Sequence, residues 1–299
     1  MRIAGKDLCL ENRPLVMGIL NVTPNSFSDG GRYLSIDHAV AHAIEMEENG
    51  ADIIDIGGES TKPGVAPISL DEECYRVLPV ITQIAKCTSI PLSIDTSKSQ
   101  VAKRALDLGV SMINDVTALR GDHEMASIVA SSGAGIVLMH MQGSPRDMQN
   151  KPMYASLLDE ILEFFRVRLA VAQQAGIHAD QILLDPGIGF GKTLSHNLNL
   201  LQQLHTFLTL GYPVVIGPSR KSFLGEIFQC PVDQRLMGTA AAVAIAIMHG
   251  ANIVRVHDVA EMLQVVHVAQ AIRSGNINAD QRIEGKTQDD ELVMLRGKV

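Results

Sequence analysis

The chain has 299 residues, 46% of them hydrophobic, which is enough to bury a large core. Its formal net charge of −8 at pH 7 argues against non-specific nucleic-acid binding, which needs a basic surface. No linker rich in Pro, Gly or Ser divides the chain. We therefore expect one domain over residues 1–273 and a polar extension over residues 274–299.

Eight short apolar segments are predicted to be strands. They are rich in Val, Ile and Leu and mostly lack polar alternation, which is typical of strands covered on both faces in a parallel sheet. The segments are residues 15–20, 52–56, 92–94, 111–114, 135–139, 181–184, 213–216 and 253–256.

Helical patterns separate these strands, and a glycine, the usual left-handed stop of a helix, follows many of them. The predicted helices are residues 36–49, 70–85, 99–108, 124–131, 157–175, 198–210, 233–248 and 260–272. The glycines are Gly50, Gly109, Gly133, Gly176, Gly211 and Gly250. Repeated strand–helix units indicate an α/β protein with a (β/α)8 TIM barrel, and a doubly wound open sheet is the alternative.

Polar residues or glycines end these strands, and in a barrel all such ends meet at one face. The end residues are Asn21, Gly57, Asp95, Asn114, His140, Asp185, Ser219 and His257. Two long connections, residues 22–35 and 58–69, follow strands and are candidate lids over that face.

Two glycine-rich segments resemble known motifs but fail on spacing. In residues 187–193, Pro186 stands where a phosphate-binding loop needs glycine, and Lys192 stands where the dinucleotide fingerprint needs one. Residues 217–221 begin like a nucleophile elbow, but Lys221 replaces the closing glycine.

The strand ends divide into acceptors and cations. Asp95, Asn114 and Asp185 suit a planar ligand with an edge of N–H donors, because a carboxylate accepts two such bonds side by side. The cations cluster near the seventh and eighth strands, where barrels often bind phosphate; they are Arg220, Lys221, Arg255 and His257, with Lys62 from the second loop. The Asn21 amide oxygen is a candidate ligand for magnesium held mainly by phosphate.

The chain resembles the dihydropteroate synthase family over about residues 15–272. The matching segments are residues 17–24, 26–31, 55–61, 93–97, 113–115, 138–143, 184–187, 189–192, 219–222 and 255–258. The resemblance implies a barrel that joins (7,8-dihydropterin-6-yl)methyl diphosphate to 4-aminobenzoate, giving 7,8-dihydropteroate and diphosphate in folate biosynthesis. It also implies Mg²⁺, a homodimer and competition by sulfonamides.

The resemblance assigns roles by position. The implied pterin-binding residues are Asp95, Asn114, Asp185, Lys221 and Arg255. The implied 4-aminobenzoate pocket consists of Phe27, Thr61, Pro63, Phe190 and Ser219. Lys62, Arg255 and His257 would bind the anion, and Asn21 would ligate the metal. The implied catalytic set is Asn21, Asp95, Lys221, Arg255 and His257.

Two positions depart from the family pattern. Asn25 stands where aspartate is usual, and Lys62 stands where arginine is usual, which keeps the charge but loses the bidentate fork. These departures leave a non-catalytic pterin-binding paralogue as an alternative. A pterin-dependent methyltransferase, which also holds a pterin in a barrel, is the other alternative. The N-terminus lacks an apolar signal core and the longest apolar run is short, so we expect a cytoplasmic protein without a membrane partner.

Overall fold

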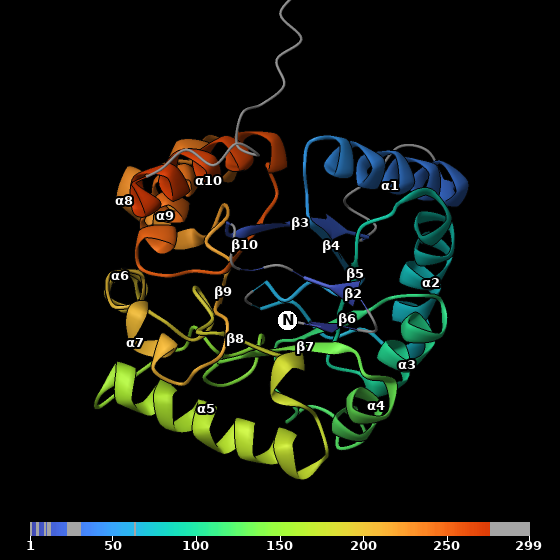
Figure 1. Ribbon diagram of the computed structural model, residues 1–299, viewed down its shortest axis with the longest axis horizontal. Coiled ribbons are helices and arrows are strands. Elements are labelled where there is room, and N and C mark those ends of the chain that lie inside the picture. The colour runs from blue at the N-terminus through green and yellow to red at the C-terminus, as the bar shows by residue number, and fades with distance from the viewer. Residues whose placement is uncertain are drawn as a thin grey trace, which may run out of the picture.

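The main sheet is a closed ring of parallel strands. The computed structural model describes residues 2–3, 6–8, 10, 13–22, 31–62 and 64–275. Eight strands follow the order β8-β7-β6-β5-β4-β3-β10-β9, and a parallel bridge between Leu184 and Val214 connects the two ends of that order. Helices surround the ring (Figure 1). The predicted (β/α)8 barrel is confirmed, and the open-sheet alternative is wrong.

Every predicted strand overlaps a strand of the ring. The strands are β3 Leu15–Asn21, β4 Ile53–Gly57, β5 Leu92–Asp95, β6 Met112–Asp115, β7 Gly135–Met139, β8 Ile182–Asp185, β9 Val215–Ile216 and β10 Ile253–Val256. The shortest of these, β9, begins two residues later than predicted. Pro213 has no amide hydrogen to donate to a neighbouring strand, although its carbonyl accepts from Leu184 N at 2.9 Å.

The helices alternate with the strands. They are α1 Gly31–Glu48, α2 Leu70–Cys87, α3 Ser99–Asp107, α4 Met125–Ser132, α5 Leu157–Gln174, α6 Leu194–Gln202, α7 His205–Leu208, α8 Ser222–Phe228, α9 Leu236–Met248 and α10 Val259–Ser274. The six predicted stop glycines all adopt the left-handed region, with φ between 68° and 101°. No helix in the described part of the chain is long and apolar enough to cross a membrane.

Two predicted helices needed correction, and one helix was missed. The first helix starts at Gly31 rather than residue 36, since glycine's poor helix propensity hid its beginning, so the predicted first loop is shorter. The predicted helix over residues 198–210 is two helices, and the first begins early because the Thr193 hydroxyl caps it at His196 N. The short helix α8 was not predicted.

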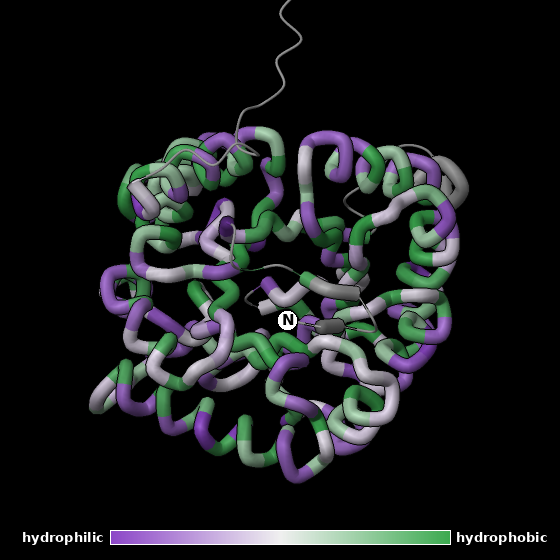
Figure 2. Tube along the Cα trace, viewed as in Figure 1, coloured by the Kyte–Doolittle hydropathy of each residue, from purple (hydrophilic) through white to green (hydrophobic). Residues whose placement is uncertain are grey.

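Two apolar layers position the site. The larger layer lies between the strands and the helices, and Figure 2 shows apolar residues along the strands with polar and apolar residues mixed on most of the helices. The smaller fills the interior of the barrel, where Leu8 packs with Met17 and Ile53. The hairpin of β1 Arg2–Ile3 and β2 Lys6–Asp7 lies over the centre of the ring (Figure 1). The N-terminal end is thus covered, and the C-terminal end is left for a site.

Substitution of Phe165 on α5 tests the packing of the larger apolar layer. The Phe165 ring is fully buried and makes edge contacts with Phe164 and Phe207, at 5.7 and 5.9 Å between centroids. We expect Phe165→Ala to lower the free energy of unfolding by about 3–5 kcal/mol, because it leaves a cavity. Denaturant unfolding measures this loss. Val167→Ala on the exposed side of the same helix should change stability by less than about 0.5 kcal/mol, and equal losses would contradict the packing described here.

Candidate functional site

Inward-facing side chains change from apolar to polar along the strands. Because side chains alternate, residues two apart on a strand share a face. Ile53, Met112, Leu183 and Ile253 belong to the interior core, and two positions further on stand Asp55, Asn114, Asp185 and Arg255. Strand register places Asp95 opposite both Gly57 and Asn114. The sequence thus folds these distant residues into one bowl at the C-terminal end of the barrel.

Arg255 is the centre of a charged network in this bowl. Its Nε donates to Asp55 Oδ2 at 2.6 Å, and its Nη2 donates to Asp95 Oδ2 at 2.9 Å. The same Asp55 oxygen accepts from Asn114 Nδ2 at 3.0 Å. Asp55 is fully buried, and its Oδ1 has no partner among the described residues. The Arg255 guanidinium therefore connects carboxylates from two strands, and Asp55 Oδ1 can still accept a hydrogen bond.

The network shifts the ionisation of its members. Burial raises the pKa of Asp95 to about 7, against the lowering effect of Arg255 and with a further rise from Asp55. Burial alone lowers the pKa of Arg255, but Asp55 and Asp95 more than offset it, so that pKa lies above its usual value. Arg255 stays charged, and Asp95 can exchange a proton near neutral pH.

Lys221 and Asp185 face each other across the bowl without a direct ion pair. Lys221 Nζ donates to Ile188 O at 2.8 Å and lies 4.0 Å from the centroid of the Phe190 ring. Burial lowers the pKa of Lys221 to about 8, although the Asp185 carboxylate raises it. Burial raises the pKa of Asp185, opposed by the Gly187 amide at 2.7 Å and by Lys221. The Lys221 ammonium group, the Phe190 ring and the Asp185 carboxylate thus lie in the same part of the bowl.

Ser219 and His257 form a hydrogen-bonded pair between β9 and β10. Ser219 Oγ lies 2.9 Å from His257 Nδ1 and accepts from the His257 backbone amide at 3.2 Å. Burial lowers the pKa of His257 to about 4, and Arg255 lowers it further. The His257 ring is therefore neutral at pH 7, whereas the sequence analysis placed it among the cations. Arg220, another expected cation, is held by Asp258, with Nε 3.0 Å from Oδ2.

The second long connection, residues 58–69, carries Thr61 and Lys62. Thr61 is half-buried and Lys62 is exposed. Glu59 anchors the start of this loop, because its Oε2 accepts from Lys98 Nζ at 2.5 Å and its Oε1 accepts from the Ile68 amide at 3.0 Å. Within the described residues, the structure records no ion pair between Lys62 and a carboxylate. The loop is therefore anchored at its start, and the exposed Lys62 ammonium group is available to an anion.

Three further predicted residues have different outcomes. Asn21 is exposed at the end of β3, opposite Gly57. Phe27 and Pro63 lie outside the described residues, as does the departure at Asn25. In the part of the chain that the structure describes, no group of three His, Cys, Asp or Glu side chains could hold a metal ion.

Asp55 and Asp115 are buried carboxylates near the C-terminal ends of β4 and β6. The sequence analysis missed Asp55 as a site residue because only Gly57 was considered at the end of β4, and Asp55 lies one pleat deeper. Its position two residues after Ile53 is the signal that would have found it. Asp115 faces away from the bowl, and its carboxylate instead accepts from Thr117 N at 2.8 Å and Leu119 N at 2.7 Å. This carboxylate stabilises a turn.

The bowl suits a flat, polar ring joined to an anion. Carboxylate and amide acceptors from β4, β5, β6 and β8 occupy one part of the rim, and cationic groups from β10 and the loop after β9 occupy another. Hydrogen bonds hold Arg255 and Lys221 in position in the folded chain, so these groups can stabilise charge that develops during a reaction. No nucleophilic Ser-His-Asp or Cys-His arrangement is needed for such chemistry.

Known proteins match this chain over nearly all of its globular part. The family model described as "Pterin binding enzyme" matches residues 17–257. The dihydropteroate synthase of Synechocystis is 46% identical over 261 residues, which cover 87% of this chain and 90% of that protein. Two solved structures agree in fold as well as sequence. A Yersinia pestis dihydropteroate synthase with a sulfonamide drug complex has a TM-score of 0.87 and 44% identity, and covers 92% of this chain and 99% of that one.

A Xanthomonas albilineans dihydropteroate synthase in complex with 7,8-dihydropteroate has a TM-score of 0.82 and 42% identity. It covers 91% of this chain and 97% of that chain. The family match spans the strands and loops that build the bowl, since it begins in β3 and ends at His257. The chain belongs to the dihydropteroate synthase family of pterin-binding enzymes.

Proposed function

We propose that the chain is a transferase that joins 4-aminobenzoate to (7,8-dihydropterin-6-yl)methyl diphosphate, releasing 7,8-dihydropteroate and diphosphate. The observation that carries this proposal is the convergence of Asp95, Asn114 and Asp185 with Arg255 and Lys221 in one bowl. The relative bound to 7,8-dihydropteroate supports the same product. Sulfonamides would compete with 4-aminobenzoate, in keeping with the drug complex of the Yersinia pestis relative.

The carboxylates and the amide would bind the pterin. Asp185 and Asp95 would accept from its N–H groups, and Asn114 would pair with a ring donor or acceptor. Lys221, which faces Asp185, would donate to the ring oxygen. Arg255, held by Asp55 and Asp95, would lie against the ring and face the diphosphate. The Phe190 ring under Lys221, with Thr61 and Ser219 and with Phe27 and Pro63, would form the 4-aminobenzoate pocket.

The reaction would proceed by departure of the diphosphate before capture by the amine. The methylene carbon–oxygen bond breaks and its electron pair leaves with the diphosphate, so positive charge spreads over the dihydropterin. The amine lone pair then forms the new carbon–nitrogen bond, and the amine loses a proton. The arylamine has a free lone pair and needs no strong base, consistent with the low pKa of His257. Positioning and electrostatics would supply most of the rate enhancement.

The leaving diphosphate would be stabilised by the cationic side of the bowl. Arg255 and Lys62 would contact its oxygens, and the neutral His257 would gain a proton more readily beside that charge. Asn21 fits a magnesium site in which substrate oxygens are the main ligands, since it offers a hard amide oxygen at a strand end. Mg²⁺ bound there would neutralise charge on the leaving group. The predicted first loop, most of which lies outside the described residues, and loop 58–69 would keep water away from the dihydropterin cation.

The direct test of the proposed function is a diphosphate-release assay. We expect release to require both 4-aminobenzoate and the dihydropterin diphosphate, because each bond change needs one of them. Release without the amine would indicate a hydrolase, and binding of the pterin without turnover would indicate a non-catalytic paralogue. Methyl transfer to a corrinoid instead of diphosphate release would indicate the methyltransferase alternative.

Substitution at Asp185 tests the pterin assignment. We expect Asp185→Ala to weaken pterin binding by about 10- to 100-fold, because a charged acceptor contributes roughly 1.5–3 kcal/mol. Calorimetry measures the affinity, and circular dichroism confirms that the barrel stays folded. Asp180→Ala, an exposed carboxylate just before β8, is the matched control and should bind the pterin normally. Unchanged affinity in Asp185→Ala would remove Asp185 from the site.

The raised pKa of Asp95 predicts a pH dependence of pterin binding. A protonated Asp95 is a poorer acceptor for ring N–H groups, so affinity should fall as the pH is lowered through about 7. Calorimetric titrations between pH 5.5 and 8 measure the slope. The Asp95→Asn variant should bind weakly with little dependence over this range. A flat profile in the unmodified protein would show that Asp95 is not a pterin acceptor in its ionised form.

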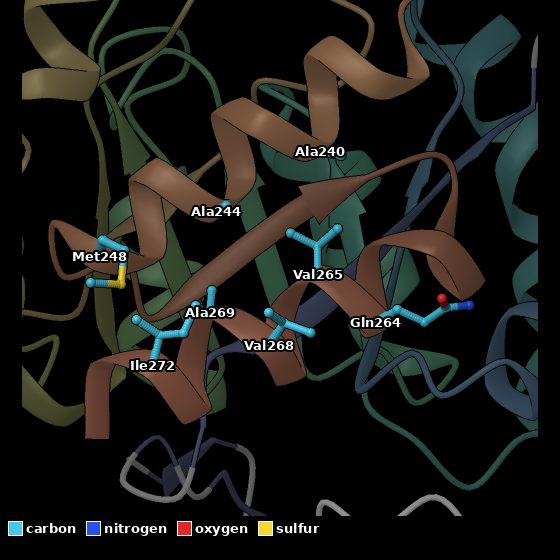
Figure 3. Close-up of a pocket in the computed structure, with 8 residues that line it drawn as sticks. All are labelled: Ala240, Ala244, Met248, Gln264, Val265, Val268, Ala269 and Ile272. Atoms are coloured by element: carbon cyan, nitrogen blue, oxygen red, sulfur yellow. The ribbon is translucent and has the colours of Figure 1, made fainter. Parts of the chain in front are cut away.

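A homodimer is the state of assembly that we propose. An apolar groove of about 420 Å³ runs between α9 and α10, with side chains from both helices lining it (Figure 3). Val268 and Ile272 are 61% and 66% exposed there, and large exposed apolar patches are typical of protein interfaces. A second copy of the chain could cover this face by two-fold symmetry. A cytoplasmic location and the polar extension over residues 274–299, of which residues 276–299 lie outside the described part, remain predictions.

Charge placed in the groove tests the dimer. We expect Val268→Lys combined with Ile272→Lys to produce a monomer, because each buried ammonium group would lose its hydration without a partner. Sedimentation velocity measures the mass of the particle. Val232→Lys is the matched control, since Val232 is also 54% exposed but lies outside the groove. An unmodified protein that sediments as a monomer, or a double variant that remains dimeric, would contradict the proposal.

A further inference from the structure

The glycine-rich segment 187–192 fits no phosphate-binding motif, but side chains bond to each of its backbone carbonyls from Ile188 to Gly191. Four successive carbonyl groups accept hydrogen bonds from side chains: Ile188 O from Lys221 Nζ at 2.8 Å, Gly189 O from Gln149 Nε2 at 2.6 Å, Phe190 O from Lys192 Nζ at 2.9 Å, and Gly191 O from Tyr154 OH at 2.8 Å. Loop carbonyls usually bond to water, so side-chain donors at each of four successive positions constrain this segment unusually strongly.

Two of these donors come from a neighbouring loop that contributes none of the predicted site residues. Gln149 and Tyr154 lie in the connection between β7 and α5, and both are half-buried. The two loops are also in close contact, because a Cβ atom at Gly187 would lie 2.0 Å from His140 O and one at Gly191 would lie 2.6 Å from Gln142 O. Both glycines have positive φ, so no other residue fits there without strain.

The segment carries Phe190, the aromatic wall of the bowl. Its ring packs against a cluster formed by Val116, Met139, Met141 and Met148. Met148 precedes Gln149, so the β7–α5 loop supports both the ring and the carbonyl before it. Lys221 Nζ lies over the same ring, at 4.0 Å from its centroid. A shift of this loop would therefore displace Phe190 and Lys221 relative to each other.

We propose that Gln149 and Tyr154 are positioning residues that set the Phe190 wall, and that they thereby determine how 4-aminobenzoate is held. This inference rests on the proposed function. The acceptors for the pterin stand on strands β5, β6 and β8, which the strand ladder holds in place. Lys221 bonds to Ile188 O, a carbonyl that neither Gln149 nor Tyr154 contacts. Loss of a positioning hydrogen bond should therefore affect the 4-aminobenzoate half of the site and leave pterin binding nearly unchanged.

Two conservative variants test the proposal by steady-state kinetics. Gln149→Leu and Tyr154→Phe each remove one donor with little change in volume. We expect each to raise the KM for 4-aminobenzoate about 3- to 10-fold, the effect of one lost neutral hydrogen bond, with the KM for the dihydropterin diphosphate changed less than about 2-fold. Equal rises in both KM values would indicate a merely structural role, and no change in either would also overturn the proposal.

The chain provides matched controls on the outer surface of the barrel. Gln173 on α5 donates through Nε2 to Tyr212 OH at 3.0 Å, which is the same pair of residue types in an exposed setting. Gln173→Leu and Tyr212→Phe should leave both KM values within about 2-fold of those of the unmodified protein. Thermal unfolding of all four variants separates a loss of overall stability from a local displacement.

A spectroscopic experiment makes the result independent of turnover. The chain contains no tryptophan, so Phe190→Trp introduces a single emitter into the wall. We expect Gln149→Leu in this background to increase acrylamide quenching about 2-fold or more, with no such increase for Gln173→Leu. If the unmodified enzyme releases no diphosphate, the proposed function fails, but increased quenching would still support the positioning role. Unchanged quenching would overturn it.

Discussion

The contact between Arg255 and the two carboxylates of Asp55 and Asp95 is the constraint on which the rest of the site depends. A guanidinium in a barrel interior loses most of its hydration, and that cost is offset only when hydrogen bonds with good geometry replace the water. The 2.6 and 2.9 Å contacts provide this replacement, and Asn114 satisfies the same Asp55 oxygen. Removing either carboxylate would leave a buried positive charge with half its partners.

The same network prepares the site for its ligand. Burial raises the pKa of Asp95 to about 7 and lowers that of Lys221 to about 8, so these two groups can exchange protons near neutral pH. Burial also raises the pKa of Asp185. A ring with N–H donors would favour the ionised carboxylates, and a departing anion would favour the charged lysine. Binding of such a ring and departure of the anion would therefore reduce the electrostatic cost of burying these ionisable groups. Such sites are functional candidates for this physical reason.

The sequence was sufficient to predict the barrel and part of the bowl. Apolar runs separated by helical patterns identify parallel strands, and their common C-terminal face follows from the topology, which is why Asp95, Asn114 and Asp185 were found. Asp55 was not found, because a residue one pleat below a strand end needs the alternation of the whole strand. The short helix α8 was missed because seven residues carry little periodicity.

Contacts between loops were beyond prediction for a different reason. The hydrogen bonds from Gln149 and Tyr154 join segments about 40 residues apart, and no local pattern specifies which amide or hydroxyl will meet a given carbonyl. The sequence analysis therefore found only a failed phosphate-binding motif in segment 187–192. In the structure, Gly187 and Gly191 allow the backbone to pass close to His140 and Gln142. The strands place Asp55, Asp95, Asn114, Asp185 and Arg255 in the bowl, and the loops add Lys62, Lys221 and the Phe190 wall. The alternation of residues along a strand is visible in a sequence, but the contact between two loops is visible only in the folded chain.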